Sequence, residues 1–166
     1  MDDKQLQFRR EVMRSDMSKL RKWMQDEQVT EHLNEDQNIG AKLQRAVQES
    51  SLPIFTPQLN RNGRFFLLTL PDKGPVGFLR LASKADAAEI VVVLGEPDIW
   101  GKGYGYRAVR KGLRHAFYEM RKERVVAKIH KGNTRSKHVF RKAGFSKDAD
   151  LEEEEKFSME LADMLM

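Results

Sequence analysis

Apolar residues follow two spacings along this chain, and each spacing predicts one type of element. In the first third they recur every three or four positions, which is typical of helices that bury one face. One helix should begin after the N-cap candidates Ser15 and Asp16, and a second should occupy residues 38–50. The stripe of the first helix comprises Met17, Leu20, Trp23 and Met24, and Val29 and Leu33 extend it.

Alternating or continuous apolar runs predict the strands. Weak alternation over residues 5–13 indicates a first strand, whereas residues 51–63 contain two prolines and an Asn-Gly pair and predict a loop. Residues 64–70 and 75–82 predict two strands joined by a turn. Residues 88–94 are almost continuously apolar, as expected for a central strand that is buried on both faces.

Strands and helices alternate in the second half. Glycines at 101, 103 and 105 predict a turn, and helical apolar spacing follows it. A strand at 125–130 is then followed by a helix that starts at Asn133 and ends at Gly144. Phe157, Met159 and Leu161 alternate and predict a last strand. This order predicts one domain over residues 1–166, with helices layered on a sheet.

Composition narrows the class of protein. The chain has 166 residues, 40% of them hydrophobic, which is enough for one buried core. It has no cysteine, so disulfides, thiolate metal sites and a cysteine nucleophile are excluded. The charged start of the chain does not resemble a signal peptide, and no apolar run approaches the roughly 20 residues of a membrane helix. We therefore expect a cytoplasmic protein.

Charge is distributed unevenly along the chain. The net charge is +5, but residues 101–142 hold fourteen Lys and Arg against only two acids, Glu119 and Glu123. Such a span predicts an anionic partner, and a solvated basic face is the simpler alternative.

The glycine turn has the chemistry of an anion site. Backbone N–H groups at a helix N-terminus attract phosphate, and glycine lets phosphate approach the main chain. A P-loop is excluded because GxxxxGK[ST] is absent. A dinucleotide fingerprint matches Gly103, Gly105 and Ala108, but residues 95–99 already separate the glycine turn from the preceding strand, and the next strand ends in Lys-Ile-His, without the ribose-binding acid. A plain tight turn before a helix remains an alternative.

Two longer segments resemble the GNAT superfamily of N-acetyltransferases. Residues 88–105 (AEIVVVLGEPDIWGKGYG) resemble the segment that ends in the family's Arg/Gln-x-x-Gly-x-Gly/Ala loop, and residues 133–145 (NTRSKHVFRKAGF) resemble its second motif. Residues 15–33 are similar to the opening helices of the branch that contains ribosomal-protein and spermidine acetyltransferases. Trp100 is a departure, because the motif has Arg or Gln there, and the resemblance is weak at 51–63 and after 146.

The resemblance implies an α+β fold, with a mixed sheet of six to seven strands that is flanked by about four helices and split at the fourth strand. The pantetheine arm of acetyl-CoA would fill the split, and the glycine turn would wrap the pyrophosphate. A homodimer is the family's habit, and membrane or nucleic-acid partners are not expected. The implied cofactor-binding residues are Val92, Val93, Leu94, Trp100, Gly101, Lys102, Gly103, Tyr104, Gly105, Asn133 and Phe140.

Acetylation of an amine requires a base, because a free alkyl ammonium has a pKa of about 10.4. Glu89 is the candidate: it lies in an apolar strand, eleven residues before the loop, where the family's histone acetyltransferases place their base glutamate. It could instead only order a water or pair with a cation. Glu96 and Asp98 are weaker candidates that we expect to be loop acids.

The thiolate that leaves acetyl-CoA can accept a proton from a donor. Many family members carry tyrosine seven residues after the asparagine, where this chain has Phe140. Ser136 matches the serine that the ribosomal-protein branch places near the CoA sulfur, so it is the candidate acid or thiol-positioning residue. A small residue packed between helix and strand is the alternative reading.

The histidines, the acidic run and three aromatic residues give weaker signals. The four histidines have no metal-binding spacing, so we expect no metal. Residues 152–155 (EEEE) predict a solvated acidic turn or, less favoured, a site for a cationic acceptor. Trp23, Phe55 and Phe65 are core candidates that could line the acceptor side. Two functions other than acetyl transfer remain: nucleic-acid binding through residues 101–142, and acyl-CoA binding without catalysis, which Phe140 would suit.

Overall fold

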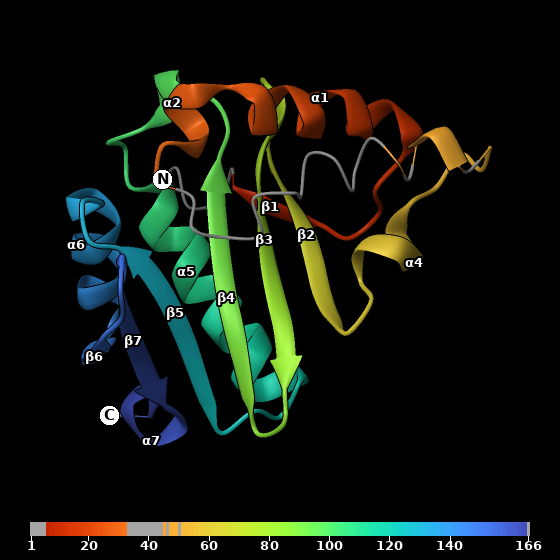
Figure 1. The fold of residues 1–166 in the computed structure, drawn as a ribbon. Coiled ribbons are helices and arrows are strands. Elements are labelled where there is room, and N and C mark those ends of the chain that lie inside the picture. The colour runs from red at the N-terminus through yellow and green to blue at the C-terminus, as the bar shows by residue number, and fades with distance from the viewer. Residues whose placement is uncertain (1–5, 33–44, 46, 50, 166) are drawn as a thin grey trace.

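The computed structural model describes residues 6–32, 45, 47–49 and 51–165. Its centre is one seven-stranded mixed sheet with the strand order β1-β2-β3-β4-β5-β7-β6 (Figure 1). The strands are β1 (Gln7–Arg9), β2 (Gly63–Leu70), β3 (Gly74–Lys84), β4 (Ala87–Leu94), β5 (Arg124–His130), β6 (Ser146–Asp150) and β7 (Glu154–Glu160).

The sheet divides at β4. This strand pairs antiparallel with β3 along its whole length. It pairs parallel with β5 only over residues 87–89, opposite residues 124–126. Beyond Glu89 the two described strands part, and Figure 1 shows the V between them. The mixed α+β sheet, split at its fourth strand, is therefore confirmed.

Helices cover both faces of the sheet and bury β4 between them. They are α1 (Arg14–Gln25), α2 (Glu27–Thr30), α4 (Thr56–Leu59), α5 (Tyr104–Arg114), α6 (Thr134–Ala143) and α7 (Leu161–Met164). Ile90 of β4 packs in a cluster with Leu79 and with Leu113 of α5. Val93 packs in a second cluster with Leu20 and Trp23 of α1. Burial on both faces explains why residues 88–94 are apolar without alternation.

Several element predictions need correction. The first strand spans only Gln7–Arg9 of the described part of the predicted 5–13, and Leu161 begins α7 instead of extending the last strand. The predicted loop at 51–63 contains the short helix α4. Strand β6 was missed because its sequence, SKDAD, is exposed throughout and has no apolar residue to alternate except one alanine.

One predicted helix falls largely on residues that the structure does not describe. Leu33 and most of the predicted helix at 38–50 lie outside the described residues, although residues 45 and 47–49 are helical. No helix in the described part of the chain is both long and apolar enough to cross a membrane.

Candidate functional site

A cleft of about 350 Å³ occupies the split between β4 and β5. One wall is the main chain and side chains of residues 90–94 of β4, and the other is residues 127–129 of β5. The rest of the lining comes from the glycine turn and the start of α5, from residues 133–142 of α6 and its cap, and from Gln28, Val29 and His32. Most of the lining is apolar, with a few polar groups, which is the usual character of a small-molecule site.

The glycine turn forms one end of the cleft in a conformation that requires glycine. Gly101 and Gly103 have φ of 76° and 90°, and Gly103 is the N-cap of α5. A Cβ added to either would find open space, so their role is conformational and not a matter of crowding. The backbone N–H groups of the first turn of α5, which have no acceptor within the helix, therefore lie at this end of the cleft.

Trp100 is fixed at the start of this turn. Its indole Nε1 donates to the carbonyl oxygen of Leu94 at 3.0 Å. The ring packs against the main core cluster and lines the cleft. The departure from Arg or Gln at this position thus places a rigid aromatic wall where the motif has a polar side chain.

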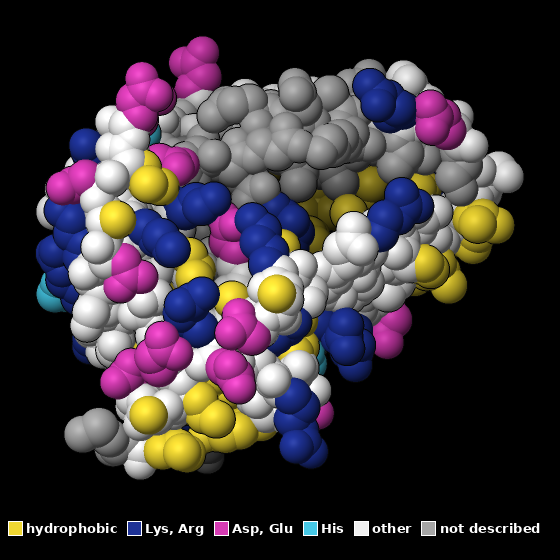
Figure 2. All heavy atoms as spheres, turned by 60° about the horizontal axis from the view of Figure 1, so that its bottom comes forward, with side chains coloured by type: hydrophobic (Ala, Val, Ile, Leu, Met, Phe, Trp, Pro, Cys, Tyr) yellow, Lys and Arg dark blue, Asp and Glu magenta, His cyan; other side chains and the backbone are white. Residues whose placement is uncertain are grey.

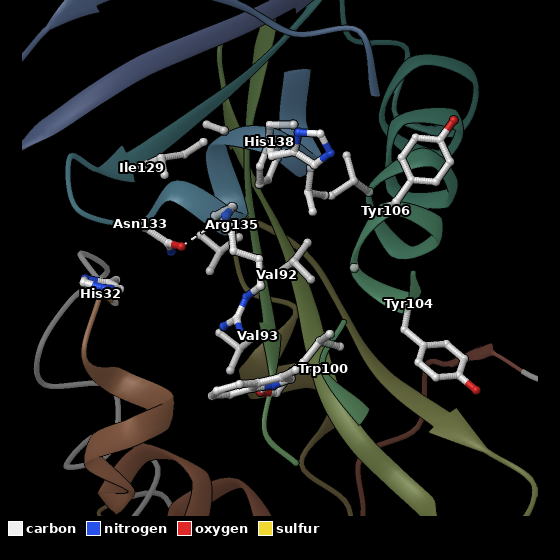
Figure 3. A pocket seen from close by; sticks show the side chains of 18 of the residues that line it. His32, Val92, Val93, Trp100, Tyr104, Tyr106, Ile129, Asn133, Arg135 and His138 are labelled. Atoms are coloured by element: carbon white, nitrogen blue, oxygen red, sulfur yellow. Dashed lines mark hydrogen bonds between the residues drawn. The ribbon is translucent and has the colours of Figure 1, made fainter. Parts of the chain in front are cut away.

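The first turn of α6 also lines the cleft. The Asn133 side chain accepts a hydrogen bond from the Ser136 backbone N–H at 3.1 Å and caps the helix, as Figure 3 shows. Asn133, Ser136 and the buried ring of Phe140 all line the cleft. Asparagine is favoured here because its side-chain oxygen satisfies a helix N–H that has no intrahelical partner.

Glu89 lies where β4 and β5 part. Its carboxylate contacts Lys84 Nζ at 2.5 Å and lies 3.8 Å from Lys128 Nζ, and its side chain is 17% exposed. The sequence placed Glu89 in an apolar strand, whereas the structure adds two ammonium groups beside it. Glu89 is not among the described residues that line the cleft, although Lys128 is.

The structure brings most of the predicted site residues together. Of the thirteen candidates, only Glu89 and Lys102 are not part of the described lining of the cleft, and Lys102 is exposed. The lining includes Val92, Val93, Leu94, Trp100, Gly101, Gly103, Tyr104, Gly105, Asn133, Ser136 and Phe140.

Sequence reasoning missed the lining residues of β5, Arg135 of α6, and His32 beyond α2. Arg135 of α6 lies over the Trp100 ring, and Lys128 of β5 lines the wall opposite β4. His32 lines the cleft too, and its ring lies 5.1 Å from that of His130 (Figure 3). A pantetheine arm that lies between two strands must contact side chains of the second strand as well. The alternation in residues 125–130 (VVAKIH) could therefore have indicated that Lys128 lines the cleft. No local pattern indicated His32.

The other acids and aromatic residues have structural contacts. Glu96 accepts a hydrogen bond from Trp23 Nε1 at 2.6 Å, and Asp98 pairs with Lys73 at 2.6 Å. Trp23, Phe55 and Phe65 are buried in the core and are not part of the described lining of the cleft.

The acidic run at 152–155 is not a solvated turn throughout. Glu154 and Glu155 lie in β7, and Glu155 pairs with Lys137 of α6 at 3.3 Å. Burial raises the pKa of Glu154, and the charge of Lys128 partly opposes that rise. Figure 2 shows Lys and Arg side chains with Asp and Glu between them on one face, not a patch of a single sign. In the described part of the chain no group of histidines and acids is suited to holding a metal ion.

One known protein family matches this chain over most of its length. A model of the GNAT acetyltransferase domain matches residues 8–146. The chain belongs to the GNAT acetyltransferase family. The GNAT fold also appears in spermidine N-acetyltransferase from Vibrio cholerae bound to CoA and spermine, with a TM-score of 0.81, 15% identity, and coverage of 98% of this chain and 99% of that one.

Two further relatives extend the comparison. AAC(6′)-Ib in complex with paromomycin and acetyl-CoA has the GNAT fold with a TM-score of 0.75, 17% identity, and coverage of 97% and 96% of the two chains. An uncharacterized N-acetyltransferase, p20 of Bacillus licheniformis, is 32% identical over 93 residues, which are 56% of this chain. The match spans about half the length of that relative, 52%.

Proposed function

We propose that this GNAT protein transfers an acetyl group from acetyl-CoA to a primary amine. The observation that carries the proposal is the parting of β4 from β5 beyond Glu89, which opens a cleft that ends at the glycine turn of α5. From that point the β5-facing edge of β4 is unpaired within the described strands. Its N–H and C=O groups, apart from the Leu94 carbonyl that Trp100 occupies, are therefore available to an amide-bearing arm.

The acceptor is a polyamine, a protein N-terminus or another small amine. The two GNAT structures compared above are complexes with spermine and with paromomycin, and both compounds are amines. Identities of 15–17% extend only the fold to this chain. The proposal therefore names the chemical class and leaves the individual amine to experiment.

Three groups would carry out the separate steps of acetyl transfer. Glu89 is the candidate general base that takes the proton of the attacking amine, directly or through water. The N–H groups of Val93 or Leu94 would stabilise negative charge on the carbonyl oxygen. Ser136, which lines the cleft at the first turn of α6, is the candidate that protonates or positions the thiolate. Transfer is direct, because the chain has no cysteine to carry the acetyl group.

The test is release of free thiol from acetyl-CoA, read with a thiol-reactive dye across polyamines, aminoglycosides and peptides with free N-termini. The chain contributes no dye background because it lacks cysteine. Release with one class of amine is expected and would identify the acceptor class.

Calorimetry with acetyl-CoA separates the alternatives. Binding without release for any amine would favour an acyl-CoA-binding protein without catalysis. No binding at all would overturn the proposal, and salt-sensitive RNA binding without competition by CoA would then favour the nucleic-acid alternative.

A further inference from the structure

Arg135 and Trp100 meet across the cleft from different elements. Arg135 lies in the first turn of α6, and Trp100 is the first residue of the glycine turn that precedes α5. The guanidinium carbon is 4.2 Å from the centroid of the indole ring. Figure 3 shows the Arg135 side chain extending from α6 to this ring, and both residues line the cleft.

The Trp100 ring is a firm support for the guanidinium. Its Nε1 is held by the Leu94 carbonyl, and its body packs on the core. A guanidinium over an indole face is attracted by the ring and keeps its N–H groups free to bond in their own plane. Within the described part of the chain, the ring is the partner that the structure shows for this guanidinium.

We infer that Arg135 is an anion-binding residue that completes the pyrophosphate site of acetyl-CoA from the α6 side, with Trp100 as its platform. The inference rests on the proposed function. It means that a guanidinium reaches the turn even though the turn itself begins with tryptophan. A planar fork of N–H donors suits phosphate oxygens better than a single ammonium does.

The other nearby cations are placed less well for this role. Lys102 is exposed and outside the described cleft lining. The Arg107 guanidinium lies over the Tyr104 ring at 5.7 Å, and Arg107 is likewise not part of that lining. Lys142 also lines the cleft, but its Nζ lies 4.5 Å from the centroid of the Tyr106 ring. Lys128 lines the cleft from β5, with its Nζ 3.8 Å from Glu89. Each offers a single ammonium, whereas Arg135 combines a place in the cleft, contact with the turn and a planar fork of donors.

The position of Arg135 in its helix also favours a ligand. A cation in the first turn of a helix is unfavourable, because the N-terminal end carries a partial positive charge. The first turn of α6 holds Arg135 and no acid. A bound phosphate would balance both the helix end and the guanidinium.

Calorimetry with three ligands tests the inference on the intact chain. The ligands are CoA, its phosphate-bearing half (adenosine 3′-phosphate 5′-diphosphate) and pantetheine, which has no phosphate. We expect Arg135→Ala to weaken binding of the first two by roughly tenfold, as for the loss of a charge-assisted pair, and that of pantetheine by less than about twofold. Arg141→Ala is the matched control: it removes the same charge from α6, but Arg141 lies over Phe157 and is not part of the described cleft lining.

A double-mutant cycle tests the platform. If Trp100 orients Arg135, the effect of Arg135→Ala on CoA binding should shrink to about twofold or less in a Trp100→Leu background. Arg135→Lys, which keeps the charge but loses the planar fork, should bind CoA with intermediate affinity. Thermal unfolding of each variant establishes that it folds, and Arg135→Lys replaces Arg135→Ala if the latter does not.

The possible outcomes separate a failure of the proposed function from a failure of the Arg135 inference alone. Failure of the unaltered protein to bind CoA would overturn the proposed function itself. Binding of CoA that is the same with and without Arg135 would overturn only this inference. An equal loss for pantetheine would also overturn it, because Arg135 would then act by holding the two walls of the cleft together.

Discussion

Glu89 is a single residue whose surroundings suit both of its interpretations. Its carboxylate lies where the strands part, which suits a base, and between Lys84 and Lys128, which suits an ion-pair acid. Glutamine keeps the shape of the side chain and removes its charge and basicity. Replacement by glutamine therefore separates the two roles.

We expect Glu89→Gln to lower kcat by about a hundredfold or more, since a general base contributes roughly that much. The KM for acetyl-CoA should change little, and the free energy of unfolding should shift by less than about 1 kcal/mol, because Lys84 and Lys128 are largely exposed. The measurement is steady-state kinetics with the amine found in the thiol-release panel.

Asp98→Asn is the control for Glu89→Gln. Asp98 is paired with Lys73 on an exposed surface outside the described cleft lining, so its replacement should leave kcat unchanged. An unchanged kcat in Glu89→Gln too would assign Glu89 to the ion pairs alone.

His115 links one residue to the pH dependence of stability. Burial lowers the pKa of His115, with further lowering by Arg10 and Arg64 against the opposite effect of Glu119. Its ring packs edge-on against Phe66 at 4.8 Å. The unfolded chain therefore binds this proton first as the pH falls below about 6.5, so the contribution of His115 to stability is present above that pH and lost below it.

We expect His115→Gln to make the melting temperature less dependent on pH between about pH 7.5 and pH 5.5 than in the unaltered protein. Calorimetric unfolding at several pH values measures this difference in slope. Parallel curves for the two proteins would show that His115 titrates alike in the folded and unfolded chains.

At the scale of elements, α5 uses two of its glycines for different purposes. A Cβ on Gly112 would lie 2.7 Å from Leu79 Cδ1 and 3.1 Å from Ile90 Cδ1, because the helix packs closely on β3 and β4. A Cβ on Gly105 would meet nothing nearer than Leu94 Cδ1 at 3.9 Å, but Gly105 lines the cleft. One glycine therefore serves packing, and the other is placed to serve the ligand.

We expect Gly112→Ala to lower the free energy of unfolding by about 1–3 kcal/mol through overpacking. Gly105→Ala should keep or raise stability, by up to about 1 kcal/mol from helix propensity, and weaken CoA binding. Denaturant unfolding and calorimetry on both variants measure the two properties. The opposite pairing, with Gly105→Ala unstable and still binding CoA, would contradict the separation.

The elements also show which local signals can be trusted. Strands β2, β3, β4 and β5 and helices α1, α5 and α6 were predicted from apolar spacing, because each buries a face that the spacing reveals. β6 has no such face: it is an exposed edge strand, held by its ladder to β7 and by Lys147, whose Nζ is 3.8 Å from Glu155 of β7. Pairing to an existing strand is tertiary information that a charged pentapeptide does not carry.

At the scale of the whole molecule, the sheet is two parts with a narrow seam. Three residue pairs, 87–89 with 124–126, join β4 to β5, and the cleft separates the strands beyond them. A ligand that fills this cleft would contact both parts and would bind only the folded chain.

We therefore expect acetyl-CoA to stabilise the protein by about 2.7 kcal/mol when its free concentration is a hundred times Kd. Thermal unfolding at increasing acetyl-CoA concentration measures the effect, and pantetheine and adenosine 3′-phosphate 5′-diphosphate serve as half-ligands. A melting temperature that does not change under saturating acetyl-CoA would contradict binding in the cleft.

The amino-acid sequence by itself determined the features that depend on neighbouring residues. The glycine turn, the α5 helix after it, the Asn133 cap and the apolar β4 strand all follow from short-range geometry and burial, and they supply most of the described cleft lining. The resemblance to GNAT acetyltransferases came from the same local motifs.

Only the tertiary structure decided which distant side chains meet. It placed Arg135 on Trp100, brought His32 beside His130, and surrounded Glu89 with lysines from two strands. These contacts depend on how β4 and β5 part and on where α6 packs. The physical reason is that side-chain contacts between elements depend on packing angles and strand register, and no spacing along the chain encodes either one.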